Sequence, residues 1–172
     1  MSASDERDFD QLYVQNQRAL HAYQLGRTGD REAARDLLQE VFLRAWRRVD
    51  AWSELPAARR RAWLFTVARH VVIDTHRARR GVEIDLEDAG AEVAAPASEE
   101  PPAQAERGER LARLDQAIRR LPERLRLVLS LHVVGGLTSA QVGELLDEPA
   151  GTIRYRLNQA RRLLAADMGD VR

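Results

Sequence analysis

The 172-residue sequence contains no cysteine and no lysine. Without cysteine, neither disulfide bridges nor thiolate zinc sites are available, which fits a reducing compartment. All 27 basic residues are therefore arginine, a bias that we attribute mainly to a GC-rich genome. No apolar run approaches the length of a membrane span, and the first thirty residues lack the basic start and apolar stretch of a signal peptide. We therefore expect a soluble, unprocessed, cytoplasmic protein with no membrane contact of its own.

The net charge of zero hides a segregated charge pattern. Residues 1–80 hold 15 arginines against 11 acidic residues, and residues 107–172 hold 12 arginines against 8 acidic residues. Residues 81–106 between them hold 8 acidic residues and no base. Each flanking segment therefore carries a net charge of +4. Either segment could bind a polyanion, although the chain as a whole is neutral.

The acidic middle segment, GVEIDLEDAGAEVAAPASEEPPAQAE, combines acidic residues, alanine and proline with few large apolar residues. Such a segment cannot bury enough apolar surface to offset the entropy lost on ordering it. On either side, apolar residues recur at spacings of three and four, and no alternating run indicates a strand. The sequence therefore predicts an all-α protein with two small helical domains, residues 1–80 and 107–172, joined by a flexible acidic linker, residues 81–106.

The first domain is predicted to contain three helices. Phe9, Leu12, Tyr13 and Leu20 mark a helix that ends before Gly26. Asp30 is placed to cap a second helix, from Arg31 to Val49. Its apolar stripe consists of Ala34, Leu37, Leu38, Val41, Phe42, Ala45, Trp46 and Val49. A loop with Trp52 and Pro56 leads to a long helix that ends near Arg80 and buries Leu64, Val67, Ala68, Val71 and Val72.

The second domain shows the pattern of a helix-turn-helix. A helix over residues 107–121 is predicted to stop at Leu121-Pro122, and the next one to end at Gly135-Gly136. Thr138 and Gln141 form a capping box that begins a short helix. After residues 147–151 a final helix begins at Thr152. A short helix, a tight turn and a longer helix are typical of DNA-binding proteins.

The final helix carries the side chains suited to contact DNA. Ile153, Leu157, Ala160 and Leu164 share one face, and residues 152–166 hold four arginines and no acidic residue. Side chains near the start of a recognition helix read bases, and the others bind phosphate. We predict base contacts from Arg154, Tyr155, Asn158 and Gln159 and phosphate contacts from Arg156, Arg161 and Arg162. A solvated amphipathic helix is the alternative, but the capped helix and turn before it favour DNA binding.

Three stretches together resemble the extracytoplasmic-function (ECF) sigma factors of bacterial RNA polymerase. LPERLRLVLSLHVVGGLTSAQVGELLDEPAGTIRYRLNQARRLL resembles region 4, which binds the minus-35 element. GDREAARDLLQEVFLRAWRR resembles the part of region 2 that docks on the polymerase clamp helices. RAWLFTVARHVVIDTHRARR resembles the part of region 2 that melts and reads the minus-10 element. The matches stand in the family's order and cover nearly all of both predicted domains.

The resemblance implies two further sets of contact residues. Polymerase-binding residues carry over onto the exposed face of the second helix, at Asp36, Gln39, Glu40 and Arg44. Minus-10 contacts carry over onto the loop from Trp52 to Arg61 and onto Trp52, Arg69, His70, Asp74, Arg77 and Arg80. A promoter base must leave the stack to be read, and a loop beside a basic helix can hold it. For Trp52 itself, a place in the core is the favoured alternative to stacking on a base.

Several positions depart from the family pattern. His70 stands where asparagine is usual, Tyr155 where a small residue is usual, and Gln159 where arginine is usual. Asp147 occupies a turn position where glycine is common, a change that aspartate tolerates. The loop before Trp63 is slightly longer than is common. We therefore expect unusual minus-10 and minus-35 preferences.

The implied function is to bind core RNA polymerase and direct it to specific promoters, without cofactor, metal or catalytic residues. The implied partners are core RNA polymerase, promoter DNA and an anti-sigma factor. A stand-alone helix-turn-helix regulator is the main alternative, and it would bind duplex DNA without polymerase. An enzyme is a weak alternative, because the four histidines have no metal-ligand spacing and no glycine-rich phosphate loop is present.

The linker length implies that the free protein is compact. A flexible chain of 26 residues spans roughly 28 Å on average and about 86 Å when fully extended. Promoter elements two helical turns apart lie roughly 70 Å from each other, and two domain radii of about 13 Å leave about 44 Å to bridge. The linker must therefore be stretched on a promoter. We expect polymerase to separate two DNA-binding surfaces that are misplaced in the free protein.

Overall fold

The computed structural model describes residues 3–80 and 102–169. These ranges contain helices and no β-strand. The helices are α1 Ala3–Thr28, α2 Arg31–Arg47, α3 Ala57–Arg80, α4 Pro102–Arg120, α5 Glu123–Val133, α6 Ser139–Leu146 and α7 Ala150–Gly169, with a 3-10 turn at Val49–Ala51. The predicted all-α class is confirmed. Most of the predicted linker, residues 81–101, lies outside the described residues.

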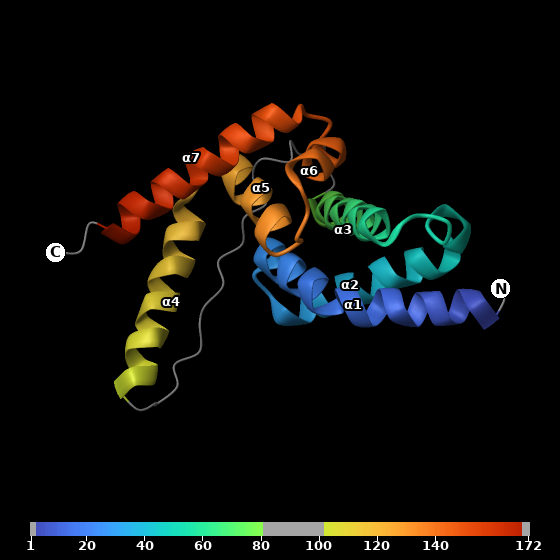
Figure 1. Cartoon of the computed structure of the whole chain (residues 1–172). Coiled ribbons are helices and arrows are strands. Elements are labelled where there is room, and N and C mark those ends of the chain that lie inside the picture. The colour runs from blue at the N-terminus through green and yellow to red at the C-terminus, as the bar shows by residue number, and fades with distance from the viewer. Residues whose placement is uncertain (1–2, 81–101, 170–172) are drawn as a thin grey trace.

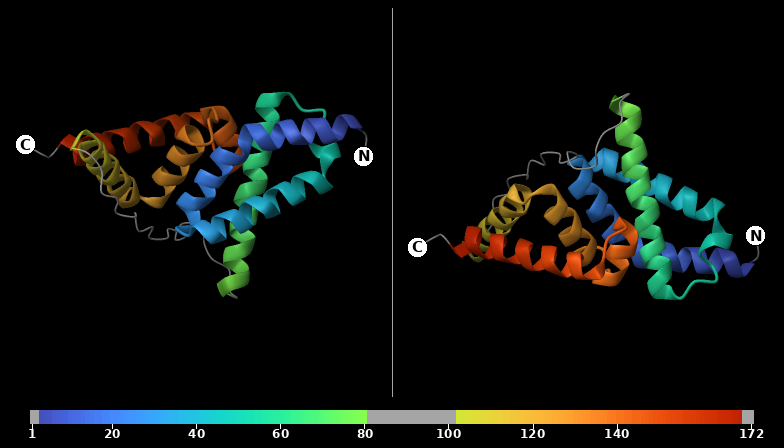
Figure 2. Two further views of the ribbon diagram at one scale, coloured as in Figure 1. Left: turned by 90° about the horizontal axis from the view of Figure 1, so that it is seen from below. Right: turned by 90° about the horizontal axis from the view of Figure 1, so that it is seen from above.

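The helices pack as two groups (Figure 1). In the first helix group, α1 and α2 pack on each other and on α3. In the second helix group, α7 packs along α4, α5 and α6. The groups touch where α3 meets α6 and where α1 meets α5, and the two views in Figure 2 show α6 beside one end of α3. In the described residues the two groups are therefore in contact, and this arrangement is called closed.

The junction of α1 and α2 corrects one boundary and confirms a cap. The first helix does not end before Gly26 but continues to Thr28. The last turn of α1 buries Tyr23, Gln24 and Arg27, and this packing outweighs the cost of about 1 kcal/mol for a helical glycine. Gly29, with a φ of 70°, then reverses the chain. The Asp30 carboxylate accepts hydrogen bonds from the N–H groups of Glu32 (2.8 Å) and Ala33 (3.3 Å), as predicted.

The second helix group begins earlier than predicted. Its first helix starts at Pro102 and not at residue 107. Proline suits the first position of a helix because its φ is already helical and no N–H is needed there. The break at Leu121-Pro122 and the end of α5 before Gly135-Gly136 agree with the prediction, and Gly136 takes a φ of 63°.

The helix-turn-helix forms with the local contacts that its sequence predicts. Thr138 and Gln141 make the complete capping box at the start of α6. Asp147 ends α6 in the left-handed conformation, with φ 56° and ψ 46°. The recognition helix α7 begins at Ala150, two positions before the predicted start, because the Pro149 carbonyl accepts the N–H groups of Thr152 (2.9 Å) and Ile153 (3.2 Å).

Gly143 fixes the distance between α6 and the turn. A Cβ atom at this position would lie 2.5 Å from the backbone oxygen of Glu148. That backbone also donates the Glu148 N–H to the Gly143 carbonyl (2.9 Å). Only glycine therefore lets the turn pack this closely on α6.

We predict that Gly143→Ala lowers the free energy of unfolding by roughly 1 to 3 kcal/mol, because the turn must move away from the added methyl group. Urea unfolding followed by circular dichroism measures this. Gly26→Ala is the matched control, since a Cβ at Gly26 meets nothing within 4 Å. The control should be stabilised by about 0.5 to 1 kcal/mol. Equal stability changes in the two variants would contradict the close approach at Gly143.

Candidate polymerase and nucleic-acid interfaces

The recognition helix α7 presents its predicted contact face to solvent. Ile153, Leu157 and Ala160 are buried and hold the helix on the second helix group. On the other side Arg154, Tyr155, Asn158, Arg161 and Arg162 are exposed, and Gln159 is half-buried. Tyr155 keeps 62% of its surface exposed, a large value for an aromatic side chain. The apolar face therefore orients α7, and the other face is free to meet DNA.

Arg156 differs from the other arginines of α7. Its Nη1 atom lies 2.7 Å from Oε1 of Glu148 in the turn, and both side chains are half-buried. The turn is thereby tied to the second turn of the recognition helix. Arg156, which sequence reasoning assigned to a phosphate, has an internal partner in the structure.

The outer face of α2 carries the four residues assigned to polymerase binding. Asp36 and Gln39 are exposed, while Glu40 and Arg44 are half-buried. Arg44 donates from Nε to Glu40 (2.7 Å) and from Nη1 to Asp74 on α3 (2.8 Å). The hydrogen bonds to Asp74 and then to Glu40 raise the pKa of Arg44. Asp74, assigned to the minus-10 contacts, is thus bound to a residue of the polymerase set, and the two sets adjoin across α2 and α3.

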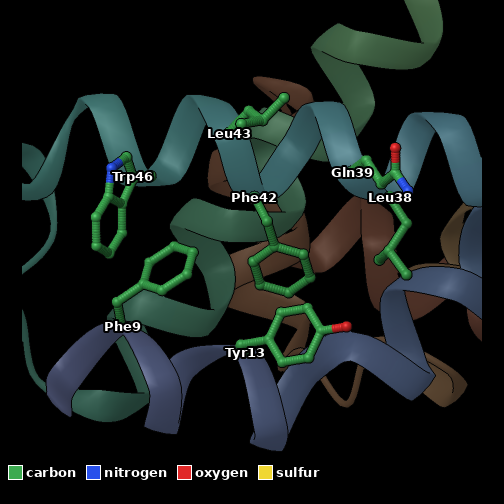
Figure 3. A pocket seen from close by; sticks show the side chains of 7 residues that line it. All are labelled: Phe9, Tyr13, Leu38, Gln39, Phe42, Leu43 and Trp46. Carbon is green, nitrogen blue, oxygen red and sulfur yellow. The ribbon is translucent and has the colours of Figure 1, made fainter. Parts of the chain in front are cut away.

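An apolar groove lies beside these residues, and sequence reasoning missed it. Figure 3 shows aromatic side chains of α1 and α2 facing each other across a hollow of about 450 Å³. Its lining residues are Phe9, Tyr13, Leu38, Gln39, Phe42, Leu43 and Trp46. The sequence assigned Phe42 and Trp46 to a closed core, but Trp46 remains 37% exposed. The sequence feature that could have indicated this groove is Leu43, an apolar residue outside the predicted stripe. It is 48% exposed in the structure.

The minus-10 residues of α3 lie along one side of that helix with different exposures. His70 and Arg77 are exposed, and Arg69 is half-buried. The Nε atom of Arg69 is buried and has no hydrogen-bond partner among the described residues. Arg80 is the last residue of α3, and its side chain lies outside the described part of the structure.

Trp52 belongs to the core, which corrects its assignment to the minus-10 contacts. Its side chain has no exposed surface, and its Nε1–H donates to the Ala45 carbonyl (2.8 Å). The Arg60 guanidinium lies 5.7 Å from the centre of the Trp52 ring and donates from Nε to the Leu55 carbonyl (2.7 Å). A buried ring with its N–H satisfied cannot stack on a base without unpacking the first helix group. Trp52 therefore supports the loop from within the core and does not contact DNA.

Residues 3–80 and 102–169 contain no group of three or more His, Asp or Glu side chains that could hold a metal ion. None of the described helices is long and apolar enough to cross a membrane.

Comparison with known proteins identifies the family. Residues 12–82 match the family model for Sigma-70 region 2, and residues 111–164 match the model for Sigma-70, region 4. The ECF RNA polymerase sigma factor SigL of Mycobacterium tuberculosis is 33% identical over 158 residues, which cover 89% of this chain and 84% of SigL. EcfG of Rhodopseudomonas palustris, also an ECF sigma factor, is 32% identical over 150 residues, covering 86% of this chain and 78% of EcfG. The chain belongs to the ECF sigma factors.

Solved structures show the same fold. The sigma factor RpoE of Bartonella quintana, in complex with the anti-sigma factor NepR, superposes with a TM-score of 0.70 at 23% identity, covering 96% of this chain and 99% of RpoE. CnrH, in complex with the cytosolic domain of CnrY, gives a TM-score of 0.63 at 23% identity, covering 97% of this chain and 91% of CnrH.

Membership of the family establishes the general role of this ECF sigma factor. It binds core RNA polymerase and directs transcription initiation, as the resemblance implied. The family consists of transcription initiation factors that are not enzymes. The alternative of a stand-alone helix-turn-helix regulator does not explain the first helix group, because that group matches Sigma-70 region 2.

Proposed function

We propose that this sigma factor acts in the cytoplasm, without catalytic activity of its own, through three surfaces. The outer face of α2 binds core polymerase, α3 with the loop before it opens and reads the minus-10 element, and α7 reads the minus-35 element. In this proposal residues 1–80 form the region 2 domain, residues 81–106 the connector and residues 107–172 the region 4 domain. The observation that carries the proposal is the exposed polar face of α7, held in place by the buried Ile153 and Leu157.

On the minus-35 element, α7 works as a rigid reader. Its apolar face fixes the helix, so Arg154, Tyr155 and Asn158 project from the end that enters the major groove. Asn158 carries the paired donor and acceptor that suit adenine, and Arg154 suits guanine or a flanking phosphate. Tyr155 is too large for the position that a small residue usually occupies, so it shifts the preferred base. Arg161 and Arg162, farther along the exposed face, bind phosphate.

On the minus-10 element, the charges of α3 are arranged for single-stranded DNA. His70 and Arg77 are exposed. The one acidic residue of this set, Asp74, is paired with Arg44 at 2.8 Å, which offsets its repulsion of phosphate. Arg69, half-buried on the same helix, has a buried Nε atom with no hydrogen-bond partner among the described residues. An extruded base can therefore lie between the loop and α3.

Gln39 of α2 lies at the centre of the surface that we propose contacts core polymerase. Gln39 is exposed, borders the apolar groove and lies next to Glu40, whose carboxylate is held by Arg44. Asp36 lies one turn earlier on the same helix and is also exposed. The surface therefore combines an apolar hollow with a polar rim, the pattern of a protein–protein interface.

We predict that Gln39→Ala weakens binding to core RNA polymerase about fivefold, because a contact of about 1 kcal/mol is lost at an interface. Glu40→Ala should weaken binding further, since it also releases Arg44. Fluorescence titration of core polymerase into labelled protein measures both affinities. The matched control is Gln116→Ala, at an exposed position of α4. If Gln39→Ala binds as well as the control while keeping its helicity, the assignment of α2 is wrong.

We predict that Asn158→Ala costs roughly 1 to 3 kcal/mol at one position of the minus-35 element and little at the others. Arg161→Ala should weaken binding to all promoters similarly and flatten the salt dependence, because it removes one phosphate contact. The measurement is transcription from a library of minus-35 sequences by holoenzyme carrying each variant. An Asn158→Ala holoenzyme that loses the same activity on every sequence would show that Asn158 positions the helix and reads no base.

An anti-sigma factor is the proposed source of control. The two helix groups match regions 2 and 4, and we propose that the signal reaches them through a partner protein. RpoE, which shares this fold, was solved with the anti-sigma factor NepR, and CnrH, which also shares it, was solved with the cytosolic domain of CnrY. We propose that the partner covers the polymerase-binding face of α2 and part of the second helix group, and that it is anchored in the inner membrane.

We predict that the protein purified from native cells brings a small helical partner with it. That partner should compete with core polymerase for binding, since both need the outer face of α2. Co-purification followed by mass spectrometry identifies it, and Gln39→Ala tests whether the two interfaces overlap. Protein that is always recovered alone and active with added core polymerase would argue against an anti-sigma factor.

A further inference from the structure

A half-buried ion pair joins the turn of the helix-turn-helix to the recognition helix α7. Nη1 of Arg156, in the second turn of α7, lies 2.7 Å from Oε1 of Glu148. The side chains of Arg156 and Glu148 are only 18% and 28% exposed. Salt and water screen a partly buried pair less than a pair on the surface. This pair is therefore suited to hold the turn and the helix in one arrangement.

The backbone around Glu148 is fixed by the helices on both sides of the turn. The Glu148 N–H donates to the Gly143 carbonyl of α6 (2.9 Å). The next residue, Pro149, accepts the N–H groups of Thr152 (2.9 Å) and Ile153 (3.2 Å) in the first turn of α7. The Glu148 side chain therefore extends from a backbone that α6 holds in place. Through it, the ion pair connects the end of α6 with the second turn of α7.

Arg156 lies away from the exposed face of α7. Successive residues of an α-helix are about 100° apart, so Arg156 is about 200° around the axis from Arg154, whereas Asn158 is only about 40° from it. Arg154 and Asn158 are exposed, and Arg156 is half-buried. To bind a phosphate, its guanidinium would have to give up a charge-assisted hydrogen bond that it already makes. Both its position and its partner favour a role inside the protein over a phosphate contact.

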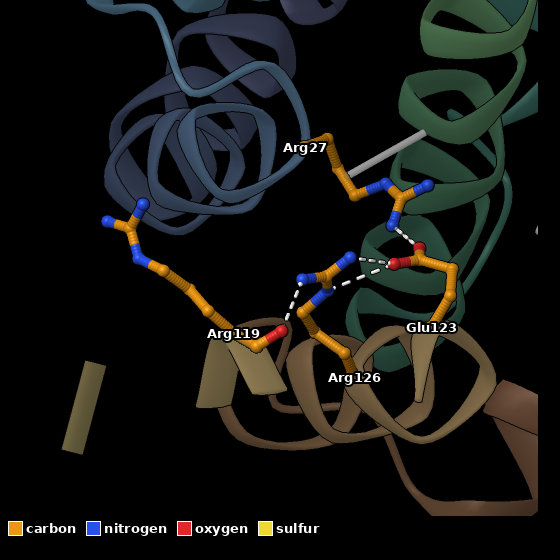
Figure 4. A network of polar contacts seen from close by, with 4 residues as sticks. All are labelled: Arg27, Arg119, Glu123 and Arg126. Carbon is orange, nitrogen blue, oxygen red and sulfur yellow. Dashed lines mark hydrogen bonds and ion pairs between the residues drawn. The ribbon is translucent and has the colours of Figure 1, made fainter. Parts of the chain in front are cut away.

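A larger ion-pair network holds the helices beside α7. Figure 4 shows Glu123 between the guanidinium groups of Arg27 and Arg126. Nε of Arg126 donates to this carboxylate (2.9 Å), and Nη1 of Arg126 donates to the Arg119 carbonyl (3.1 Å). These residues belong to α1, α4 and α5. The pair in the turn differs from this network because one of its members belongs to α7 itself, close to the exposed contact residues.

We propose that Glu148 and Arg156 are a positioning pair that sets the specificity of α7 for the minus-35 element. This rests on the proposed function, in which α7 reads that element. The pair does not touch DNA. It fixes the second turn of α7 relative to α6, so that Arg154 and Tyr155 meet the base edges in one orientation. Readout by hydrogen bonds depends on set distances and angles, so a helix that can tilt accepts more than one base pair.

The test compares Glu148→Ala, Arg156→Ala and the double variant, each assembled with core RNA polymerase. Transcription from a library of minus-35 sequences gives the preference for the best base at each position, which is typically roughly 5- to 150-fold. We expect each variant to lose at least about threefold of this preference at one or more positions. The double variant should lose no more than either single variant, because all three remove the same contact.

The salt dependence of promoter binding separates a positioning role from a phosphate contact. The double variant keeps the net charge of the parent protein. Loss of one phosphate contact lowers the ratio of parent to variant affinity about threefold between about 50 and 200 mM salt. We expect that change for Arg161→Ala and a constant ratio for the double variant, measured by fluorescence anisotropy of a labelled promoter duplex. A threefold change in the double variant would show that Arg156 binds phosphate and would overturn the proposal.

The matched control is Asp167→Ala, which breaks the exposed pair of Asp167 with Arg120 of α4 (3.3 Å) near the end of α7. It should leave the base preferences unchanged, because it does not act on the turn. Unchanged preferences in the Glu148 and Arg156 variants, or an equal loss in the control, would overturn the proposal. Circular dichroism checks the helicity. Should Arg156→Ala lose helicity, Glu148→Gln removes the charge and keeps the shape, and an unchanged preference there would also overturn the proposal.

Failure of the proposed function gives a different result. If α7 does not read the minus-35 element, the parent holoenzyme shows no preference in the library, and Arg161→Ala leaves the salt dependence unchanged. That result refutes the assignment of α7 and the positioning pair with it. A parent holoenzyme with clear preferences that all the variants retain refutes the positioning pair alone.

Discussion

The structure depends on one apolar core that continues from the first helix group into the second. Leu20 of α1, Phe65 of α3, Leu131 of α5, Val142 of α6 and Ile153 of α7 belong to the same buried cluster. Because α2 and α7 turn apolar residues towards this core, their polar faces are fixed outwards. The shared core also brings polar side chains of the two groups together, and there they must pair or remain unsatisfied.

The arginines of this lysine-free chain divide into two sets with different tasks. Arg27, Arg44 and Arg156 each bind a carboxylate of another element, and Arg61 binds a backbone carbonyl of the other helix group. A guanidinium remains charged and offers several directed donors, so it can join elements in this way. Arg154, Arg161 and Arg162 are exposed on α7. Amino-acid composition does not show which arginines belong to which set. The set of each arginine depends on whether it lies on the buried or the exposed face of its helix.

Sequence reasoning succeeded where the determining contacts are local. The cap at Asp30, the capping box of Thr138 and Gln141 and the left-handed turn at Asp147 each involve residues within four positions, so the helix-turn-helix was predictable almost to the residue. Contacts distant in sequence were not predictable: Arg27 and Glu123 are 96 positions apart, and no local pattern marks either as a partner. The contact residues on α2 and α3 came from family resemblance, since an exposed charged face looks like any solvated one. Periodicity also could not show that Trp46 and Leu43 line a groove.

Closure does not affect the two DNA-binding surfaces equally. Arg154, Tyr155 and Asn158 of α7 are exposed in the closed protein, whereas Ala58 and Arg61, in the segment proposed to contact the minus-10 element, form hydrogen bonds with the second helix group. The free sigma factor can therefore touch duplex DNA through α7, but a single basic helix gives mainly weak, salt-sensitive binding. In the proposed assignment, melted DNA contacts the segment from Trp52 to Arg61 as well. Stable promoter contact then requires the groups to separate, and the connector must be stretched at the same time to span the promoter. In the proposed assignment, polymerase contacts the exposed face of α2, which α6 does not cover, and it can supply the free energy for that separation.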